Sequence, residues 1–124
     1  MRKLKTKWFA KWARKQKISD SRLLGAIDDM QNSLSSVDLG SGLHKVRVSP
    51  DHRGKSSASR VIIVYRQEDR AVMVYGFMKN EQENLTAQEL RTFKKLAKDI
   101  LSLSETELTI ATKKKVFIEI GDAE

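Results

Sequence analysis

The 124-residue sequence contains no cysteine and only one proline. The absence of cysteine excludes a disulfide scaffold, a cysteine-based zinc site and a thiol nucleophile, and it fits a reducing compartment. No stretch approaches the roughly 20 apolar residues of a membrane span, and the first 17 residues lack the apolar core of a secretory signal. We therefore expect a cytoplasmic location and no membrane contact.

Several patterns of enzyme chemistry are also missing. The sequence has no glycine-rich nucleotide motif after a strand and no carboxylate pair at a recognisable spacing, and its two histidines, His44 and His52, have no metal-ligand companions. We therefore expect no metal and no cofactor. Aromatic residues make up only 6% of the chain, which disfavours a stacking platform for single-stranded nucleic acid.

Positive charge is what the sequence has in excess. The formal net charge is +8, and eight lysines and arginines lie in residues 1–17 without one acid. A basic surface attracts polyanions, so this segment predicts contact with nucleic acid, with Lys11 and Lys15 as candidates. A solvated helix face that aids solubility or meets an acidic protein explains the same charges, and the sequence does not choose between them.

The hydrophobic patterns predict one α+β domain over residues 1–124. In its first helix, Trp8 and Trp12 lie four residues apart and are expected to face the core. The expected elements are, in chain order, a strand at 2–5, helices around 8–13 and 19–34, strands at 43–48, 61–65 and 71–75, helices that begin at the capping boxes of Thr86 and Ser104, and an edge strand at 115–120.

The strands at 61–65 and 71–75 form a hairpin in this interpretation. Both are continuous apolar runs, which indicates a sheet that is covered on both faces or strongly curved. A turn centred near residues 67–69 pairs Val61 with about Tyr75. The two outer ends of the hairpin therefore meet at one end of the sheet.

Four basic residues are expected at that end. Arg60 begins one hairpin strand and Lys79 follows the other, while Lys45 and Arg47 share one face of the preceding strand, although the sequence leaves open which face. Like charges this close repel one another. A bound anion would remove that cost, so the cluster predicts a phosphate-binding site.

The polar loop at residues 49–58 adds further candidates. It contains Arg53, Lys55 and a Gly-Lys-Ser-Ser run whose backbone N–H groups are suited to line a phosphate, although ordinary solvated loops have the same composition. His44 is a reserve general base or RNA contact because an unperturbed histidine has a pKa of about 6.5. A histidine that is simply hydrogen-bonded beside a strand explains it equally well.

Several segments carry a resemblance to a known family. GLHKVRV at 42–48, GKSSASRVIIVY at 54–65 and YGFMKNEQENL at 75–85 resemble the RelE-like toxins of bacterial type II toxin–antitoxin modules, with the nearest likeness to the HigB-like branch. The resemblance extends over nearly the whole chain, including LKTKWFAKWARK at 4–15 and FKKLAKDILSLS at 93–104. It implies a small antiparallel twisted sheet with two N-terminal helices and C-terminal helices packed on it. It also implies a ribosome-dependent mRNA endonuclease that a cognate antitoxin of the helix-turn-helix type neutralises.

The resemblance places the catalytic residues at Lys45, Arg47, Arg60 and Lys79. In metal-independent RNA cleavage by the substrate's own 2′-OH, arginines suit the phosphate oxygens and lysines suit proton transfer. A tyrosine that some members carry after the hairpin has no equivalent at 80–88. Two alternatives remain, a gyrase-inhibiting toxin of the ParE-like type, which generally lacks these cations, and an RNA-binding module without catalysis.

Overall fold

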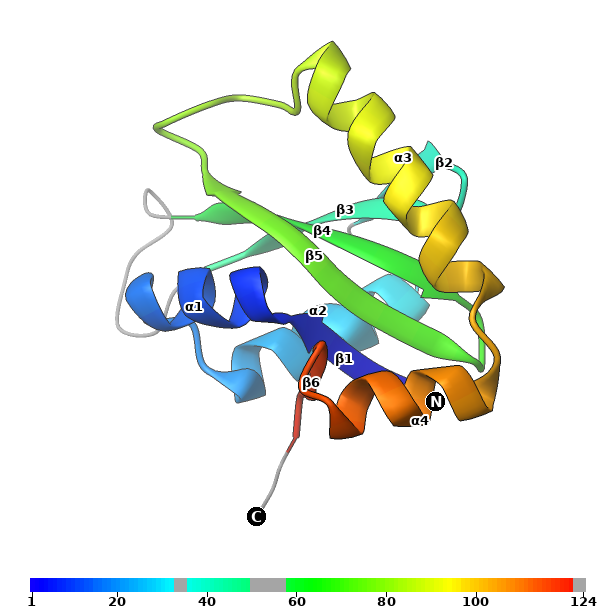
Figure 1. The fold of residues 1–124 in the computed structure, drawn as a ribbon. Helices are drawn as coiled ribbons and strands as arrows, with labels where there is room; N and C mark the ends of the chain where they lie inside the picture. The colour runs from blue at the N-terminus through cyan, green and yellow to red at the C-terminus, as the bar shows by residue number, and fades with distance from the viewer. Residues whose placement is uncertain (33–35, 50–57, 122–124) are drawn as a thin grey trace.

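The computed structural model describes residues 1–32, 36–49 and 58–121. In these ranges it has a six-stranded mixed sheet and four helices (Figure 1). The strands are β1 (Arg2–Thr6), β2 (Ser36–Gly40), β3 (Leu43–Val48), β4 (Ser59–Arg66), β5 (Arg70–Met78) and β6 (Phe117–Glu119). The helices are α1 (Lys7–Lys15), α2 (Asp20–Gln31), α3 (Ala87–Ser102) and α4 (Glu105–Lys113).

The strands lie in the order β2-β3-β4-β5-β1-β6, so β6 is at an edge, as predicted. The predicted α+β class is confirmed, with the difference that the sheet is mixed because β1 pairs with β5 in parallel. The second edge strand, β2, was not predicted. It pairs only with β3, and its apolar alternation is limited to two residues, Val37 and Leu39, neither of which is fully buried.

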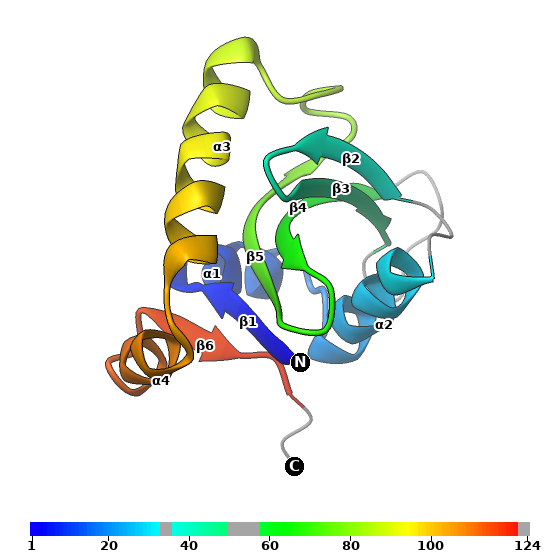
Figure 2. The same ribbon diagram turned by 90° about the vertical axis from the view of Figure 1, so that its right-hand side faces the viewer.

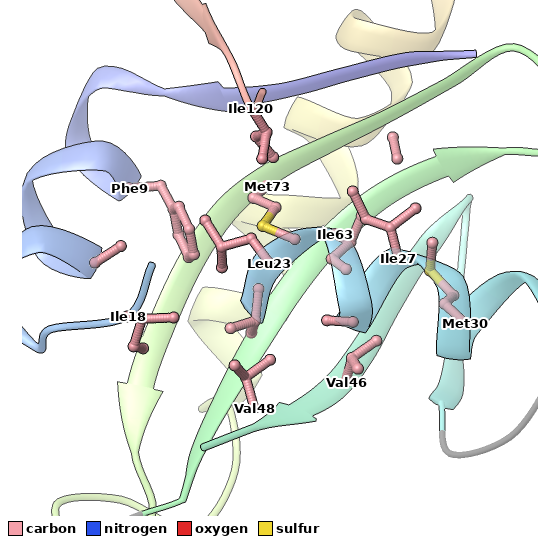
Figure 3. Close-up of a cluster of buried hydrophobic side chains, with 14 residues drawn as sticks. Phe9, Ile18, Leu23, Ile27, Met30, Val46, Val48, Ile63, Met73 and Ile120 are labelled. Carbon is pink, nitrogen blue, oxygen red and sulfur yellow. The ribbon is translucent and has the colours of Figure 1, made fainter. Parts of the chain in front are cut away.

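Both faces of the sheet are covered, which is one of the two arrangements that the apolar runs indicated. Figure 2 shows α3 and α2 on opposite sides of the curved sheet, and each side has its own hydrophobic core. The labelled residues of the core beneath α1 and α2 (Figure 3) are Phe9, Ile18, Leu23, Ile27, Met30, Val46, Val48, Ile63, Met73 and Ile120. The core beneath α3 and α4 includes Leu4, Leu43, Ile62, Val64, Val72, Phe77, Ile100 and Leu108.

The helix ends agree with the capping residues in the sequence. Both predicted capping boxes are present, at Thr86 for α3 and at Ser104 for α4. The end of α3 has a further support, because the buried Arg70 donates hydrogen bonds to the carbonyl oxygens of Ile100 and Leu103 at 2.8 and 2.7 Å. An arginine at a helix C-terminus satisfies carbonyl groups that have no partner inside the helix.

The prediction for the first helix was partly wrong. Phe9 and Ala13 are buried and Trp12 is partly buried, but Trp8 is 50% exposed. The helix begins where β1 ends and packs along β5. There Trp12 lies so close to Gly76 that a Cβ atom at this glycine would overlap its ring.

The hairpin of β4 and β5 contains one β-bulge. Ile63 is opposite Met73 but Ile62 is opposite Tyr75, so Val74 has no residue opposite it. Val61 consequently faces Gly76, one residue beyond the expected partner. The bulge shifts every later pair of the hairpin by one position.

Candidate functional site

The two arginines expected at the sheet end are direct cross-strand neighbours. Arg47 on β3 is opposite Arg60 on β4, which is opposite Phe77 on β5. Since side chains alternate along a strand, Arg60 shares a face with Ile62, and Arg47 shares a face with Lys45. Ile62 belongs to the core beneath α3 and α4, so all three cations lie on that side of the sheet, which the sequence had left open.

Neither arginine has a carboxylate partner among the residues that the structure describes. Arg47 is exposed and makes no hydrogen bond or ion pair with a described residue, while Arg60 has only a 3.5 Å contact from Nη1 to the carbonyl oxygen of Ser59. Lys79 is also exposed. Its backbone N–H donates to the carbonyl oxygen of Ala58 at 3.3 Å, which places it at the same sheet end.

Some other arginines of the chain have carboxylate partners. Arg2 pairs with Glu105 at 2.7 Å and Arg66 pairs with Asp69 at 2.7 Å. The Arg66 hydrogen bond is the main cause that lowers the pKa of Asp69. The Arg47–Arg60 pair differs from these two ion pairs, because it places two arginines directly opposite one another with no carboxylate partner among the described residues.

A second row of residues adjoins this pair. Lys45 is opposite Ile62, which is opposite Tyr75, so the bulge brings a tyrosine onto the face of the cations. The Lys45 ammonium donates to Asn84 Oδ1 at 2.8 Å. The sequence did not indicate that Tyr75 and Asn84 lie beside these cations. Tyr75 is on this face because of the β-bulge, which no residue pattern in the sequence predicted.

Hydrogen bonds join the segment at 79–86 to the start of α3. Gln82 Nε2 donates to the carbonyl oxygen of Asn84 at 2.9 Å and to Glu89 Oε1 at 3.1 Å, while the Tyr75 hydroxyl donates to Glu89 Oε2 at 3.1 Å. The bond from the Thr86 backbone N–H is the largest cause that lowers the pKa of Glu89. Burial, and then the Glu89 carboxylate, raises the pKa of Tyr75, so its hydroxyl stays protonated at neutral pH.

His44 lies apart from the cations. It is opposite Ile63 and its ring meets the edge of Tyr65, on the side of the sheet that faces α2. Burial lowers its pKa, and its buried Nδ1 has no hydrogen-bond partner among the described residues. The structure therefore separates the reserve general base from the Arg47–Arg60 pair.

The other predicted RNA contacts fall in two places. Lys11 and Lys15 are exposed on α1, where they line a groove with Trp8 and Trp12. Arg53 and Lys55, like His52, lie outside the described residues. Within the described residues, no group of three histidine, aspartate or glutamate side chains is arranged to hold a metal ion. No helix in this part of the chain has the length and apolar content to cross a membrane.

Comparison with known proteins identifies a family. The family model for the RelE toxin of the RelE/RelB toxin–antitoxin system matches residues 1–120, and a comparison with curated proteins finds no significant match. The fold and the match together define a toxin of a toxin–antitoxin system. The chain belongs to the RelE toxin family, whose members generally inhibit translation and are generally endoribonucleases, and membership implies a cognate antitoxin.

Proposed function

We propose that this chain is a ribosome-dependent mRNA endonuclease, an mRNA interferase of the HigB-like branch, with Lys45, Arg47, Arg60 and Lys79 in its active site. The observation that carries the proposal is the Arg47–Arg60 cross-strand pair without a described anionic partner. Like charges directly opposite one another destabilise a sheet. A phosphodiester between the two guanidinium groups would convert that repulsion into attraction.

The proposed reaction uses the substrate's own nucleophile. The 2′-oxygen attacks the adjacent phosphorus, so a 2′-O–P bond forms and the P–O5′ bond breaks, which yields a 2′,3′-cyclic phosphate and a free 5′-OH. Arg47 and Arg60 hold the non-bridging oxygens, where negative charge accumulates in the transition state, through forked N–H donors. One proton leaves the 2′-OH and one is delivered to the 5′-oxygen, so the reaction needs no oxidant or reductant.

Lys45 and Lys79 are the proposed proton-transfer groups, because lysine exchanges a proton more readily than arginine. Asn84 holds the ammonium of Lys45 from the segment at 79–86. Tyr75 is a positioning residue in this proposal. Its hydroxyl donates to Glu89 in the first turn of α3. Glu89 also accepts a hydrogen bond from Gln82, and Gln82 lies in the same segment as Asn84, which binds Lys45.

The proposed partners follow from the same chemistry. Translated mRNA on the ribosome is the substrate in the cytoplasm, and a helix-turn-helix antitoxin covers or distorts the cation row, which consists of Lys45, Arg47, Arg60 and Lys79. Lys11 and Lys15 would contact RNA phosphates without reading sequence. Such contacts weaken steeply as the salt concentration rises.

Primer extension on a translated mRNA tests the catalytic assignment. The Arg60→Ala and Lys79→Ala variants should each cleave on the order of 100-fold more slowly, which is the usual effect of removing one transition-state donor. Arg66→Ala is the matched control, because Arg66 lies on the same strand at its far end and pairs with Asp69. Folded Arg60→Ala and Lys79→Ala variants that cleave like the parent would disprove the assignment.

Two further assays separate the alternatives. If the purified chain blocks DNA gyrase in a plasmid supercoiling assay and leaves translated mRNA intact, a ParE-like toxin replaces the proposal. If the chain binds intact mRNA on ribosomes and no transcript is cut, the proposal fails in favour of an RNA-binding module. Transcripts cut only while ribosomes occupy them would support the interferase.

A further inference from the structure

One face of α1 is open and aromatic. Trp8, Lys11, Trp12 and Lys15 follow the i, i+3, i+4, i+7 spacing of a single helix face, and together they line a groove of about 320 Å³. Trp8 is 50% exposed, although tryptophan is among the side chains that gain most from burial. Trp12 packs against the core, whereas the Trp8 ring, which lines the groove with Lys11 and Lys15, stays half exposed.

The rings of this groove continue to the candidate active site. Trp8 is nearly parallel to Trp12, with an interplanar angle of 9° and a centroid distance of 6.3 Å, and it stacks on Tyr75 at 5.0 Å. Tyr75 in turn contacts Phe77 at 6.1 Å, and Phe77 is directly opposite Arg60. A run of aromatic side chains therefore connects the groove on α1 to the arginine pair.

The backbone beneath the groove is shaped for this arrangement. Trp12 packs over Gly76, where any Cβ atom would overlap its ring. Gly76 has no left-handed φ angle to explain the glycine, so the close approach of the ring is its reason. This contact fixes Trp12, one of the residues that line the groove, against β5, the strand that also carries Tyr75 and Phe77.

We propose that this groove binds a nucleotide of single-stranded RNA beside the cleavage site, with the base stacked on Trp8 and the flanking phosphates on Lys11 and Lys15. The proposal rests on the proposed function, since the strand would be the mRNA substrate. Charge favours RNA as the occupant, because residues 1–17 carry eight cations and no acid. Stacking on an exposed ring combined with lysine–phosphate contacts is a common mode of single-strand binding.

The test uses the parent chain and two uncleavable probes. The first is a 2′-O-methyl hexaadenylate, which lacks the attacking hydroxyl, and the second is the same ribose-phosphate chain without bases. Both tryptophans of the protein lie in the groove, so their fluorescence reports on it directly. The hexaadenylate should quench this fluorescence, and the abasic probe should not.

Affinities of labelled probes, measured by anisotropy, give the decisive comparison. Trp8→Leu should weaken hexaadenylate binding about 5- to 100-fold and leave abasic binding unchanged. Lys11→Gln should weaken binding of both probes and reduce its salt dependence. Ile110→Ala is the matched control, because Ile110 is a similarly exposed apolar residue on α4, and it should change neither affinity.

Three results would overturn the inference. In the first, Trp8→Leu binds hexaadenylate with an affinity within twofold of the parent. In the second, Trp8→Leu loses affinity equally for both probes. In the third, Trp8→Leu no longer binds the antitoxin but still binds RNA. The last result would make the groove part of the antitoxin interface. Since the probes cannot be cut, a chain without nuclease activity can still show base-dependent binding, and a chain that cleaves mRNA can still fail this test.

Discussion

The Arg47–Arg60 pair should cost the folded protein stability, and this cost is measurable. Both side chains lie on one face of adjacent strands, directly opposite one another, where Cβ atoms are about 5 Å apart. Neither has a carboxylate partner among the described residues. Replacing one arginine by glutamine removes the repulsion and keeps a polar side chain of similar reach.

The magnitude follows from the exposure of the two groups. Two unit charges about 7 Å apart repel by about 0.6 kcal/mol at the dielectric constant of water and by about 2.4 kcal/mol at an effective value of 20. Arg47 is exposed and Arg60 is half-buried, so solvent screening favours the lower end. We expect about 0.5 to 1 kcal/mol, within the range of cross-strand pairs, or a rise in Tm of about 2 to 5 °C.

A double-mutant cycle isolates this repulsion from other effects of the substitutions. Unfolding by urea is measured for the parent, Arg47→Gln, Arg60→Gln and the double variant, at low salt and at 1 M salt. The coupling should be repulsive at low salt and nearly vanish at 1 M, where the Debye length is about 3 Å. Each single variant should also lose cleavage activity on the order of 100-fold. A coupling that is attractive, or one that salt leaves unchanged, would refute the reasoning.

Three further predictions concern the fold that supports the site. Because burial lowers the pKa of His44, the folded state binds a proton at His44 less readily than the unfolded chain does, and stability is lost as pH falls below about 6.5. The free energy of unfolding, measured with urea between pH 5 and 7, should therefore depend less on pH in the His44→Gln variant. Arg70→Met leaves the last carbonyl groups of α3 without their donor and should lower the free energy of unfolding by about 1 to 3 kcal/mol, whereas Arg66→Met at an exposed position should have little effect. Gly76→Ala should displace Trp12, which costs about 1 to 3 kcal/mol and changes tryptophan fluorescence.

Much of the fold was predictable because its signals are local. Thr86 and Ser104 start helices through capping boxes that can be read directly from the residues. The apolar runs of β4 and β5 indicated a sheet that is covered on both faces or strongly curved, and both faces are covered. β2 escaped prediction because its apolar alternation consists of only two residues, Val37 and Leu39. A signal for it was nevertheless present in Ser41 and Gly42, which both have positive φ angles and form the two-residue turn that joins β2 to β3.

The aromatic residues show a limit of composition as evidence. Eight aromatic residues in 124 argued against a stacking surface, but composition does not say where the rings lie. Six of the eight form one connected set of ring contacts that includes Trp8, Trp12 and Tyr75. The separation of four residues between the tryptophans was visible in the sequence. Their assignment to the core failed for Trp8, because α1 extends beyond β1 and lies along β5, and this placement depends on tertiary packing.

The largest effect that the sequence could not reveal comes from one residue, Val74. In a regular hairpin Val61 would face Tyr75, which would put the tyrosine on the α1 side of the sheet, since side chains on the same strand alternate and opposite residues share a face. The bulge at Val74 moves Tyr75 opposite Ile62 and Phe77 opposite Arg60, and it turns Gly76 toward Trp12. A one-residue slip reverses every side chain beyond it. The bulge therefore gives the cation row its aromatic neighbours and also gives Trp12 the glycine that it packs against.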